Sequence, residues 1–408
     1  MSNNNPFNLQ PDVTEDVTIS YGKLNFIFRP NNSALLKLTL NSKNFRSWFK
    51  EPYIKVQTAE GDHRIQYLPP KIHNSVYIDL SWIRANRTEL TLESIGATFA
   101  SEAQMLYFAF NDPIEMGTTL VIAPHPDDGE LCCTSFYRPN TYLVTLSAGE
   151  KVKELKKQYY TNMDNSIEQA SLRKGILRAY NSVTTPMLGD IRQDRMVNLG
   201  YFDATLAEMN KSRDQVIKTN HSHSISTFRK FNPQPNFAEL TADPENKYSN
   251  LIADLTSVIK TVNPDRIVVT NPYLDTHLDH MAAGQMLLEL LDLIPNNVRY
   301  VYLYSIHIKR EKPIFFGPAL NQVGMPYIPT ARIPETCRLK YRSFDLSEEQ
   351  QKVKTIMANM MFDTYKFKDH RYQKCPYTDY INSPKIGKAY YFQRFVKQNE
   401  VFLVIERQ

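Results

Sequence analysis

Histidine and carboxylate side chains stand close together in the segment VIAPHPDDGE, residues 121–130. His125, Asp127 and Asp128 lie within four residues of one another. Imidazole nitrogen and carboxylate oxygen are both common ligands of zinc and other divalent metals. The segment therefore offers one arm of a metal site. Because proline and aspartate are also frequent in turns, a plain turn is an alternative interpretation of this segment taken alone.

A second segment, NPYLDTHLDH at 271–280, supplies His277, Asp279 and His280. Two histidines three residues apart, with a carboxylate between them, offer a further metal ligand together with an acid–base group. The alternative is that Asp279 caps a helix and that the histidines lie on the surface. Taken together, the two segments supply a histidine and aspartate set for a divalent metal, with carboxylates to spare, and this joint signal is much stronger than either segment alone.

Both segments directly follow runs that are typical of buried parallel strands, TTLVIA at 118–123 and RIVVT at 266–270. Ligands of open α/β sheets bind beyond the carboxyl ends of the strands, so both segments fall where a site is expected. Strand-like and helical patterns alternate around them, which predicts an open, mostly parallel, Rossmann-like α/β sheet with helices on both faces. Further strands are expected at 141–147, 299–307 and 400–406, and helices at 163–182, 248–262, 280–294 and 347–361.

The chain before this region has a different pattern. Short β-like runs such as ALLKLTL and SVYIDLSW are separated by clusters of Asn, Pro, Gly and Ser. This spacing predicts a β-sandwich accessory domain over residues 14–112, after a disordered polar leader at 1–13. The α/β domain then spans 113–408, with a long polar insertion or active-site loop at 211–247. The accessory domain carries no catalytic constellation, so a packing or orienting role is favoured over sugar binding.

Composition excludes several classes of protein. The 408 residues carry a formal net charge of +5 and four cysteines without a CxxC pair, so neither a zinc ribbon nor a disulfide framework is expected. The sequence contains no basic run interleaved with aromatic residues, so nucleic-acid binding is not expected. No secretory signal and no apolar run of about 18 residues is found, which predicts a cytoplasmic location. The mild positive charge suits a phosphorylated sugar or peripheral contact with an anionic inner membrane face, although a simple solvated surface is favoured.

The paired segments resemble the two motifs of the PIG-L/LmbE-like de-N-acetylases, (A/P)HPDDE and HxDH. That family contains the deacetylases of N-acetylglucosaminyl-phosphatidylinositol and of the mycothiol precursor. The resemblance covers roughly residues 118–310. One departure is Gly129, which stands where the family usually has an acidic residue, while Glu130 follows one place later.

The resemblance implies a role for each residue of the two motifs. Three ligands would hold zinc, with iron or another divalent metal as the alternative, and would leave positions for water and substrate. Asp127 would be the general base toward the water. His277, in its protonated form, would stabilise the oxyanion, and either of these two would protonate the leaving amine. Asp279 would orient His277 or support the site from outside. The three ligands would be His125, Asp128 and His280.

Weaker matches lie between the motifs. SLRKGILRAY at 171–180 resembles the family helix whose arginine contacts substrate, here Arg173, and NLGYFD at 198–203 offers Asp203 for a sugar hydroxyl. An exposed helix charge and a turn residue are the respective alternatives. The pair His221 and His223 is interpreted as a polar loop feature, and Cys132 and Cys133 as core residues.

The resemblance implies a hydrolase that removes an N-acetyl group from an amino sugar in a glycan, glycolipid or lipopolysaccharide-type intermediate. A thiol-conjugate amidase of the same superfamily is an alternative, because it would use the same metal chemistry on a larger amide. A non-catalytic carbohydrate-binding protein on a relic of the same fold is a third hypothesis, which the intact motifs disfavour.

Overall fold

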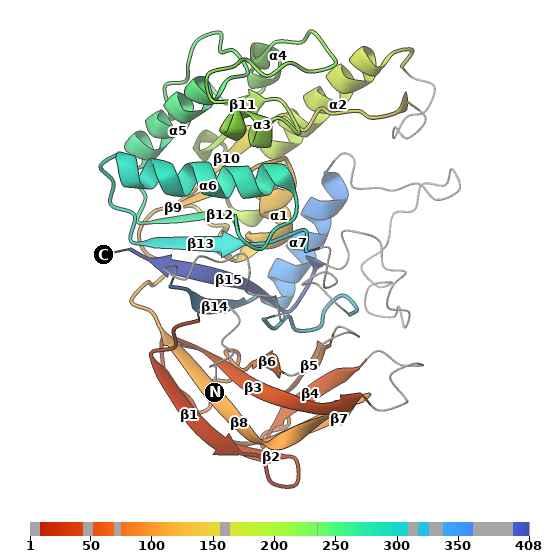
Figure 1. The fold of residues 1–408 in the computed structure, drawn as a ribbon, viewed down its shortest axis with the longest axis vertical. Helices are drawn as coiled ribbons and strands as arrows, with labels where there is room; N and C mark the ends of the chain where they lie inside the picture. Colours follow the sequence, from red (N-terminus) through yellow and green to blue (C-terminus); the bar gives the residue numbers. More distant parts are fainter. Residues whose placement is uncertain are drawn as a thin grey trace.

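The structure is a computed structural model that describes residues 9–43, 52–68, 75–155, 164–234, 236–308, 317–325, 338–361 and 395–407. Its upper part in Figure 1 is a seven-stranded mixed sheet covered by helices, and its lower part consists of two four-stranded antiparallel sheets. The chain is therefore of mixed α/β class. No helix among the described residues is both long and apolar enough to cross a membrane.

Five parallel strands form the centre of the large sheet, in the order β11-β10-β9-β12-β13. The strands β9, β12 and β13 are buried along their whole length, as their β-branched and aromatic sequences require. Two strands then extend the sheet in antiparallel fashion, β15 beside β13 and β14 at the edge. The strands are β9 (Thr119–Ala123), β10 (Thr141–Ser147), β11 (Met196–Tyr201), β12 (Arg266–Thr270), β13 (Tyr300–Tyr304), β14 (Lys340–Asp345) and β15 (Asn399–Glu406).

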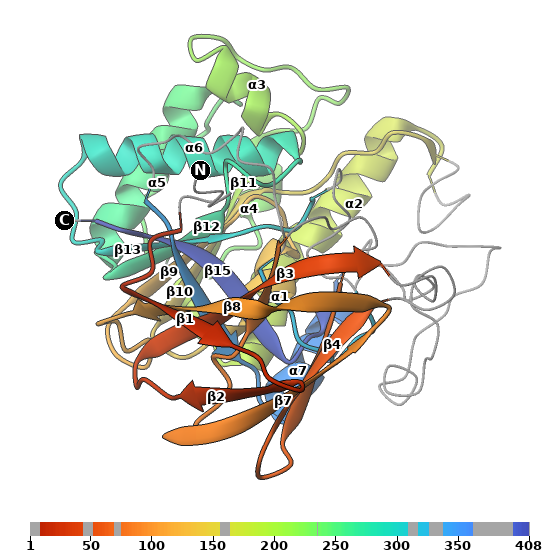
Figure 2. The same ribbon diagram turned by 60° about the horizontal axis from the view of Figure 1, so that its bottom comes forward.

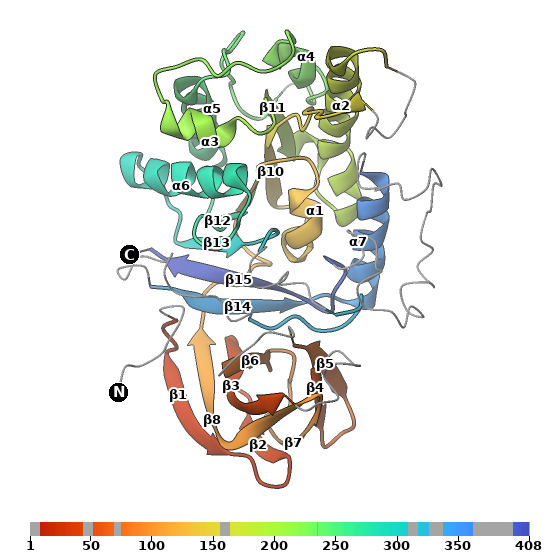
Figure 3. The same cartoon turned by 45° about the vertical axis from the view of Figure 1, so that its right-hand side comes forward.

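The direction in which the sheet grows reverses between β9 and β12. From β9 the chain passes through α1 and α2 to β10 and β11 on one side, and then returns through α5 and α6 to β12 and β13 on the other. Figure 3 shows α5 and α6 on one face of the sheet and α1, α2 and α7 on the opposite face. The longer helices are α2 (Ile167–Ser182), α5 (Tyr248–Val262), α6 (Leu278–Leu293) and α7 (Glu348–Met360); α1 (Asp128–Cys132), α3 (Leu206–Lys211) and α4 (Ile225–Arg229) are short.

Most of the elements predicted in this region are confirmed. The structure contains a strand within or largely overlapping each predicted range: 118–123, 141–147, 266–270, 299–307 and 400–406. It also contains the four predicted helices. The helix at 347–361 begins with a capping box between Ser347 and Gln350, a local signal that fixes its start. The strands β11 and β14 were not predicted. The stretch 211–247 is largely irregular but contains α4.

The two smaller sheets share one hydrophobic core. Alternating burial along β2 and β4 turns one face of each strand inward, and the buried residues of both sheets form a single cluster that includes Phe26, Leu36, Ile54 and Ile78. Figure 2 shows β1, β8 and β3 lying side by side. One sheet contains β1 (Val13–Thr18), β8 (Ala97–Ala109), β3 (Asn32–Lys43) and β6 (Ser75–Asp79); the other contains β2 (Lys23–Ile27), β7 (Arg87–Ile95), β4 (Tyr53–Thr58) and β5 (His63–Tyr67).

The start of the chain differs in part from the disordered leader expected over residues 1–13. Residues 1–8 lie outside the described residues, but Leu9 is buried, forms a parallel bridge with Leu339, and is followed by β1 from Val13. Leu9 therefore belongs to the core. The few apolar residues in this polar stretch give no periodic pattern over its length, which is why the sequence did not show that Leu9 is a core residue.

The two-sheet module, residues 9–109, is joined to the large sheet by a buried polar network centred on Asp79. This carboxylate is fully buried and accepts hydrogen bonds from the backbone and hydroxyl of Ser81 (3.1 and 2.5 Å). It also accepts from Ser343 Oγ on β14 at 2.9 Å and from Asn399 Nδ2 on β15 at 3.0 Å. Arg64 adds an ion pair to Asp345 at 2.7 Å. The module is thereby held in a fixed place against β14.

Burial raises the pKa of Asp79 to about 6, which predicts a pH dependence of stability. The folded chain binds this proton more tightly than the unfolded chain, so the free energy of unfolding should fall as the pH rises from about 4 to about 6, by on the order of 3 kcal/mol. Asp79→Asn cannot ionise and should lack this contribution. Urea unfolding of both chains at several pH values, with EDTA present, checks the prediction. A stability difference between the two chains that stays constant from pH 4 to 7 would contradict it.

Candidate metal centre

The two chemistry-bearing segments meet at the carboxyl ends of β9 and β12, the neighbouring strands between which the sheet reverses direction. A crevice forms at such a position because the connections leave the two strands toward opposite faces. The start of α6 is tied to the end of β12, since Thr270 Oγ1 donates to the carbonyl of His280 at 2.8 Å. A Cβ at Gly284 would stand 2.4 Å from the carbonyl oxygen of Thr270, so glycine permits this close approach.

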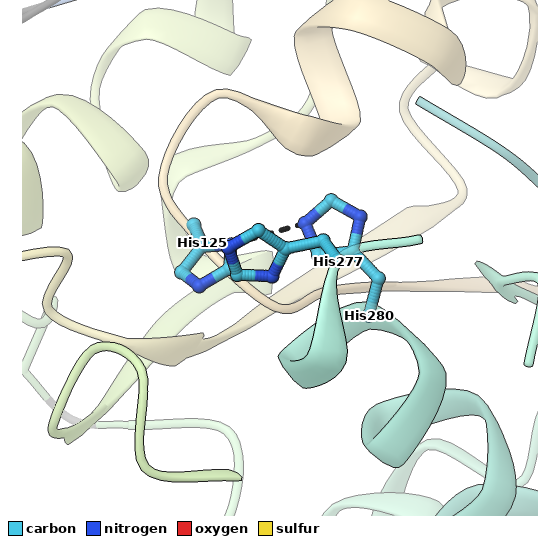
Figure 4. A group of neighbouring side chains, drawn as sticks. All are labelled: His125, His277 and His280. Carbon is cyan, nitrogen blue, oxygen red and sulfur yellow. Dashed lines mark hydrogen bonds between the residues drawn. The ribbon is translucent and has the colours of Figure 1, made fainter. Parts of the chain in front are cut away.

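Three side-chain atoms form a nearly equilateral triangle in this crevice. His125 Nδ1 lies 3.2 Å from Asp128 Oδ2 and 3.1 Å from His280 Nε2, and His280 Nε2 lies 3.2 Å from Asp128 Oδ2. Figure 4 shows the imidazoles of His125 and His280 converging, one from the loop after β9 and the other from α6. All three side chains are buried. These are the three residues that the sequence analysis named as metal ligands.

The triangle has the size that a small metal ion requires. Ligand atoms about 2.1 Å from a tetrahedral zinc ion stand about 3.4 Å apart, close to the observed separations. Two imidazoles and a carboxylate are also a ligand set that zinc accepts. The imidazoles of His125, His277 and His280 together present nitrogens that lie within 4.8 Å of one another. The residues present therefore fit a divalent metal.

Each histidine of the triangle is held from behind by carboxylates. His280 Nδ1 lies 3.1 Å from Asp275 Oδ2, and Asp275 also accepts backbone hydrogen bonds from His277 and Ile306. On the other side, His125 Nε2 lies 3.3 Å from both Asp203 Oδ1 and Asp279 Oδ2. A carboxylate behind a ligating histidine fixes the orientation of its ring and the nitrogen that faces the metal.

These carboxylates make the crevice strongly favourable for a positive charge. Burial works against protonated His280, but Asp128 and Asp275 outweigh it and raise the pKa of His280 to about 10. Burial likewise works to lower the pKa of His125, but the hydrogen bonds that its ring donates to Asp128, Asp203 and Asp279 hold it well above its usual value. For Asp128, burial raises the pKa, but His280 and His125 hold it well below its usual range. A proton or a metal ion would satisfy this demand for positive charge.

Of the two roles expected of Asp279, orienting His277 or supporting the site from outside, the contacts of its side chain fit the second. Its Oδ2 faces His125, and its Oδ1 accepts the backbone N–H of Ala207 at 3.2 Å. No hydrogen bond or ion pair between Asp279 and His277 is present among the described residues. Asp275, five residues before His280, is the carboxylate that binds the backbone of His277, and the sequence analysis did not single it out.

His277 is the first residue before α6 and lies beside the triangle. Its ring centre is 4.9 Å from that of His125 and 4.7 Å from that of His280. Its Nδ1 is buried and has no hydrogen-bond partner in the described part of the chain. Burial, with the charges of His125 and His280, lowers the pKa of His277 to about 4. So low a pKa argues against the protonated form of His277 that the family resemblance implies. A metal ion bound beside the ring would lower this pKa further.

Asp127 stands outside the triangle. Its backbone has φ 115°, a strained conformation for a residue with a side chain, at the start of α1. Arg178 on α2 holds it, because Arg178 Nη2 donates to Asp127 Oδ1 at 3.0 Å and also to the carbonyl of Pro126. The carboxylate is thus kept near the metal ligands while its neighbour Asp128 joins them.

The sequence model of the family described as PIG-L, GlcNAc-PI de-N-acetylase, matches residues 120–291. This segment contains both motifs and every residue of the triangle. Residues 120–291 belong to the PIG-L family. Family membership supports a deacetylase-type hydrolase, and members commonly use a divalent metal. No curated protein matches the chain.

Several solved structures resemble the chain weakly. They include the conserved protein TT1542 from Thermus thermophilus, with 16% identity over 59% of this chain and 79% of that chain and a TM-score of 0.30. GalB, the 4-carboxy-2-hydroxymuconate hydratase from Pseudomonas putida, has 12% identity over 60% and 79% of the two chains, and also a TM-score of 0.30. A family two carbohydrate esterase from Cellvibrio japonicus has 10% identity over 86% and 98%, with a TM-score of 0.20. Scores this low carry no argument about activity.

The departure from the PIG-L motif at Gly129 has a packing reason. A Cβ at this position would stand 2.4 Å from the hydroxyl of Tyr137, so a larger residue cannot fit without displacing that ring. Glu130 is buried beneath the site, where burial, with Asp127 and Asp128, raises its pKa to about 8. The acidic residue that follows the aspartates is therefore part of the interior.

The two residues expected to bind substrate lie in different surroundings. Arg173 on α2 is 39% exposed and pairs with Asp164, with Nη2 2.7 Å from Oδ1. Asp203 contacts His125, and its backbone N–H donates to Glu150 at 3.0 Å. The structure brings Asp203 to the metal ligands and pairs Arg173 with a residue outside them.

Two further histidines lie near the site that the sequence did not mark as site residues. His221, expected to lie in a polar loop, is buried with its Nε2 3.2 Å from Glu150 Oε1, so it supports the carboxylate that binds Asp203. His307, after β13, has its ring centre 5.1 Å from that of His280. Cys132 and Cys133 are buried free thiols, as expected of core residues.

The position of Asp275 predicts that it controls metal affinity without binding the metal. Asp275→Asn should lower the affinity for zinc about 10- to 100-fold, because His280 loses the charge that orients it. The measurement is competition with a chromophoric chelator, followed by metal analysis. Asp292→Asn is the matched control, since Asp292 lies near the far end of α6, the helix that carries His280, is 77% exposed and pairs with Arg407. Equal affinities in the two variants would contradict the role of Asp275.

Proposed function

We propose that this chain is a metal-dependent hydrolase that removes the N-acetyl group from an amino sugar in a glycan, glycolipid or lipopolysaccharide-type intermediate. The observation that carries the proposal is the triangle of His125 Nδ1, Asp128 Oδ2 and His280 Nε2, with separations of 3.1 to 3.2 Å, beside the separately held carboxylate of Asp127. Membership of the PIG-L family supports the reaction class.

The metal would be held by His125, Asp128 and His280, and zinc is the ion that suits this donor set best. A divalent metal bound there supplies Lewis acidity, which polarises an amide carbonyl and acidifies water. Asp275 and Asp279 keep the two imidazoles oriented from behind. A metal ion held in this way would supply the positive charge, and Asp127 and His277 would handle the proton and the oxyanion.

Asp127 acts as the general base in this proposal, as the family resemblance implies; Arg178 holds its carboxylate beside Asp128, whereas Asp203, Asp275 and Asp279 contact the ring nitrogens of the two ligating histidines. It accepts a proton from the attacking water as the carbon–oxygen bond forms. Arg178 fixes the position of Asp127 Oδ1, so the base is already aligned before substrate binds. The protonated Asp127 then returns this proton to the nitrogen of the sugar as the carbon–nitrogen bond breaks, and the products are a free amine and acetic acid, which releases the second proton of the water as it ionises to acetate.

His277 stabilises the oxyanion that develops on the acyl group. With a pKa of about 4 it is neutral at pH 7, so it donates a hydrogen bond through one N–H rather than as an imidazolium. A neutral imidazole is a poor acid for the leaving amine, which is why Asp127 is assigned the returning proton. Asp275 accepts a hydrogen bond from the backbone N–H of His277 and so holds this residue at the N-terminus of α6.

The decisive experiment is incubation of the zinc-loaded chain with a panel of N-acetylated amino sugars, glycans and glycolipids. Mass spectrometry should show the loss of one acetyl group together with a new free amine. The matched control is Asp128→Ala, which should neither retain zinc nor release acetate. A zinc-loaded chain that binds these compounds but hydrolyses none would favour the carbohydrate-binding alternative, and cleavage only of larger thiol-conjugate amides would favour the amidase.

Replacement of the general base separates metal binding from turnover. Asp127→Ala should keep its zinc and lose about 10²- to 10⁴-fold in kcat, because proton transfer from water is lost while the ligands remain. Zinc content and kcat are measured on the same preparation. An Asp127→Ala chain with unchanged kcat would rule out this role.

The two arginines of α2 give a matched pair of variants. Arg178→Met should lower kcat about 10- to 100-fold, because Asp127 is no longer held in place. Arg173→Met should change kcat and KM less than about twofold, because Arg173 is partly exposed and already paired with Asp164. A large rise in KM for Arg173→Met would instead restore the substrate-binding role that the family resemblance implies.

A further inference from the structure

A cavity of about 510 Å³, separate from the metal site, lies where the two-sheet module meets the large sheet. Its lining comes from both parts, with Phe28 and Arg84 on the module side and Ser135, Arg138 and Arg342 on the other. It contains none of the metal-site residues. Because three arginines line this cavity, its net charge depends on how many of them are paired with a carboxylate.

Two of these arginines have carboxylate partners. Arg84 pairs with Asp345 at 3.3 Å, and that carboxylate is also bound by Arg64 at 2.7 Å. Arg138 lies 3.7 Å from Glu115, which is 75% exposed, so this pair is weak. Both carboxylates that line the cavity are therefore already matched by an arginine.

Arg342 has no such partner. Its guanidinium makes no hydrogen bond or ion pair with any residue that the structure describes, and its Nη1 is buried. The nearby buried carboxylate, Asp112, already binds Arg266 Nη2 and the hydroxyl of Tyr302, both at 2.6 Å. Burial lowers the pKa of Arg342, which reflects the cost of a desolvated cation. Charges that are withdrawn from water in proteins are normally paired, so a partly buried arginine with no partner in the described part of the chain requires a reason.

The surroundings of Arg342 hold it in one orientation. Its guanidinium carbon lies 4.4 Å from the ring centre of Phe110 and 5.0 Å from that of Phe344, so the planar group stacks on two aromatic rings. Nearby, Ser135 at the cavity is only 3% exposed, and its hydroxyl has no hydrogen-bond partner in the described part of the chain. A fixed cation and an unsatisfied donor thus face one space.

We infer that this cavity is a binding site for an oxyanion, a carboxylate or phosphate group carried by a sugar-sized ligand, with Arg342 as its principal contact. A guanidinium presents two parallel N–H groups that match the oxygens of either anion. Arg138 and the hydroxyl of Ser135 supply further donors. The inference does not depend on the proposed hydrolase activity, because it uses different residues.

Calorimetric titration of the full-length chain tests the inference, with glucuronate and glucose 6-phosphate as separate probes at constant ionic strength. At least one should bind saturably, in the millimolar range or tighter, and the stronger of the two identifies carboxylate or phosphate as the preferred group. Glucose, which has neither group, should bind at least tenfold more weakly. Absence of saturable binding by both anions overturns the proposal.

Variants separate this site from other cationic surfaces. Arg342→Met should weaken binding at least tenfold while leaving the melting temperature unchanged or higher, because it removes a partly buried charge that has no ion-pair partner among the described residues. Arg138→Met, a second variant, should weaken binding several-fold. Arg299→Met is the matched control, since Arg299 also lies 5.4 Å from a ring, that of Tyr300, but pairs with Glu406. His280→Ala should bind normally. Full binding by Arg342→Met, or its loss in His280→Ala, overturns the proposal.

Discussion

Three lone-pair donors, one each from His125, Asp128 and His280, are held within 3.2 Å of one another in a buried crevice. Such atoms repel one another unless a positive charge lies between them. The fold must therefore hold the three atoms together, and a bound cation must offset their repulsion. The force comes from the sheet, because β9 and β12 are neighbours and their following segments leave toward opposite faces. The orientation of each ring comes from carboxylates behind it. A site of this kind is stable only with its cation, either a proton or a metal.

Much of the large sheet could be predicted, because its central strands are continuous β-branched runs and its helices have long periodic patterns. The strands that escaped prediction carry mixed sequences. β14, Lys340–Asp345, contains three charged residues and a serine among its six, and β11, Met196–Tyr201, contains a glycine with positive φ at Gly200. Their strand conformation is imposed by neighbours in the sheet rather than by their own sequence preference.

The residues of the two motifs were identified because histidine and aspartate at close spacing are rare and specific. Residues that act through another side chain gave no such signal. On α2 the buried stripe contains Ser171, Lys174, Arg178 and Ser182, which are polar or small, so no apolar periodicity marked the face that carries Arg178. Glu150 and His221 are far apart in sequence and meet only in the fold. The resemblance directed attention to Arg173, five residues from the arginine that contacts Asp127.

The position of the two-sheet module has a consequence for how the chain avoids self-association. The strand β14 is the last of its sheet, and an uncovered last strand presents unpaired backbone groups to other molecules. Here Ser33 Oγ accepts the backbone N–H of Ser343, while Lys340 binds Asp12 and the carbonyl of Ala109. The module thus covers an edge that would otherwise recruit a strand from a second chain. An α/β region expressed without it would expose a template for aggregation, whatever the state of its metal ligands.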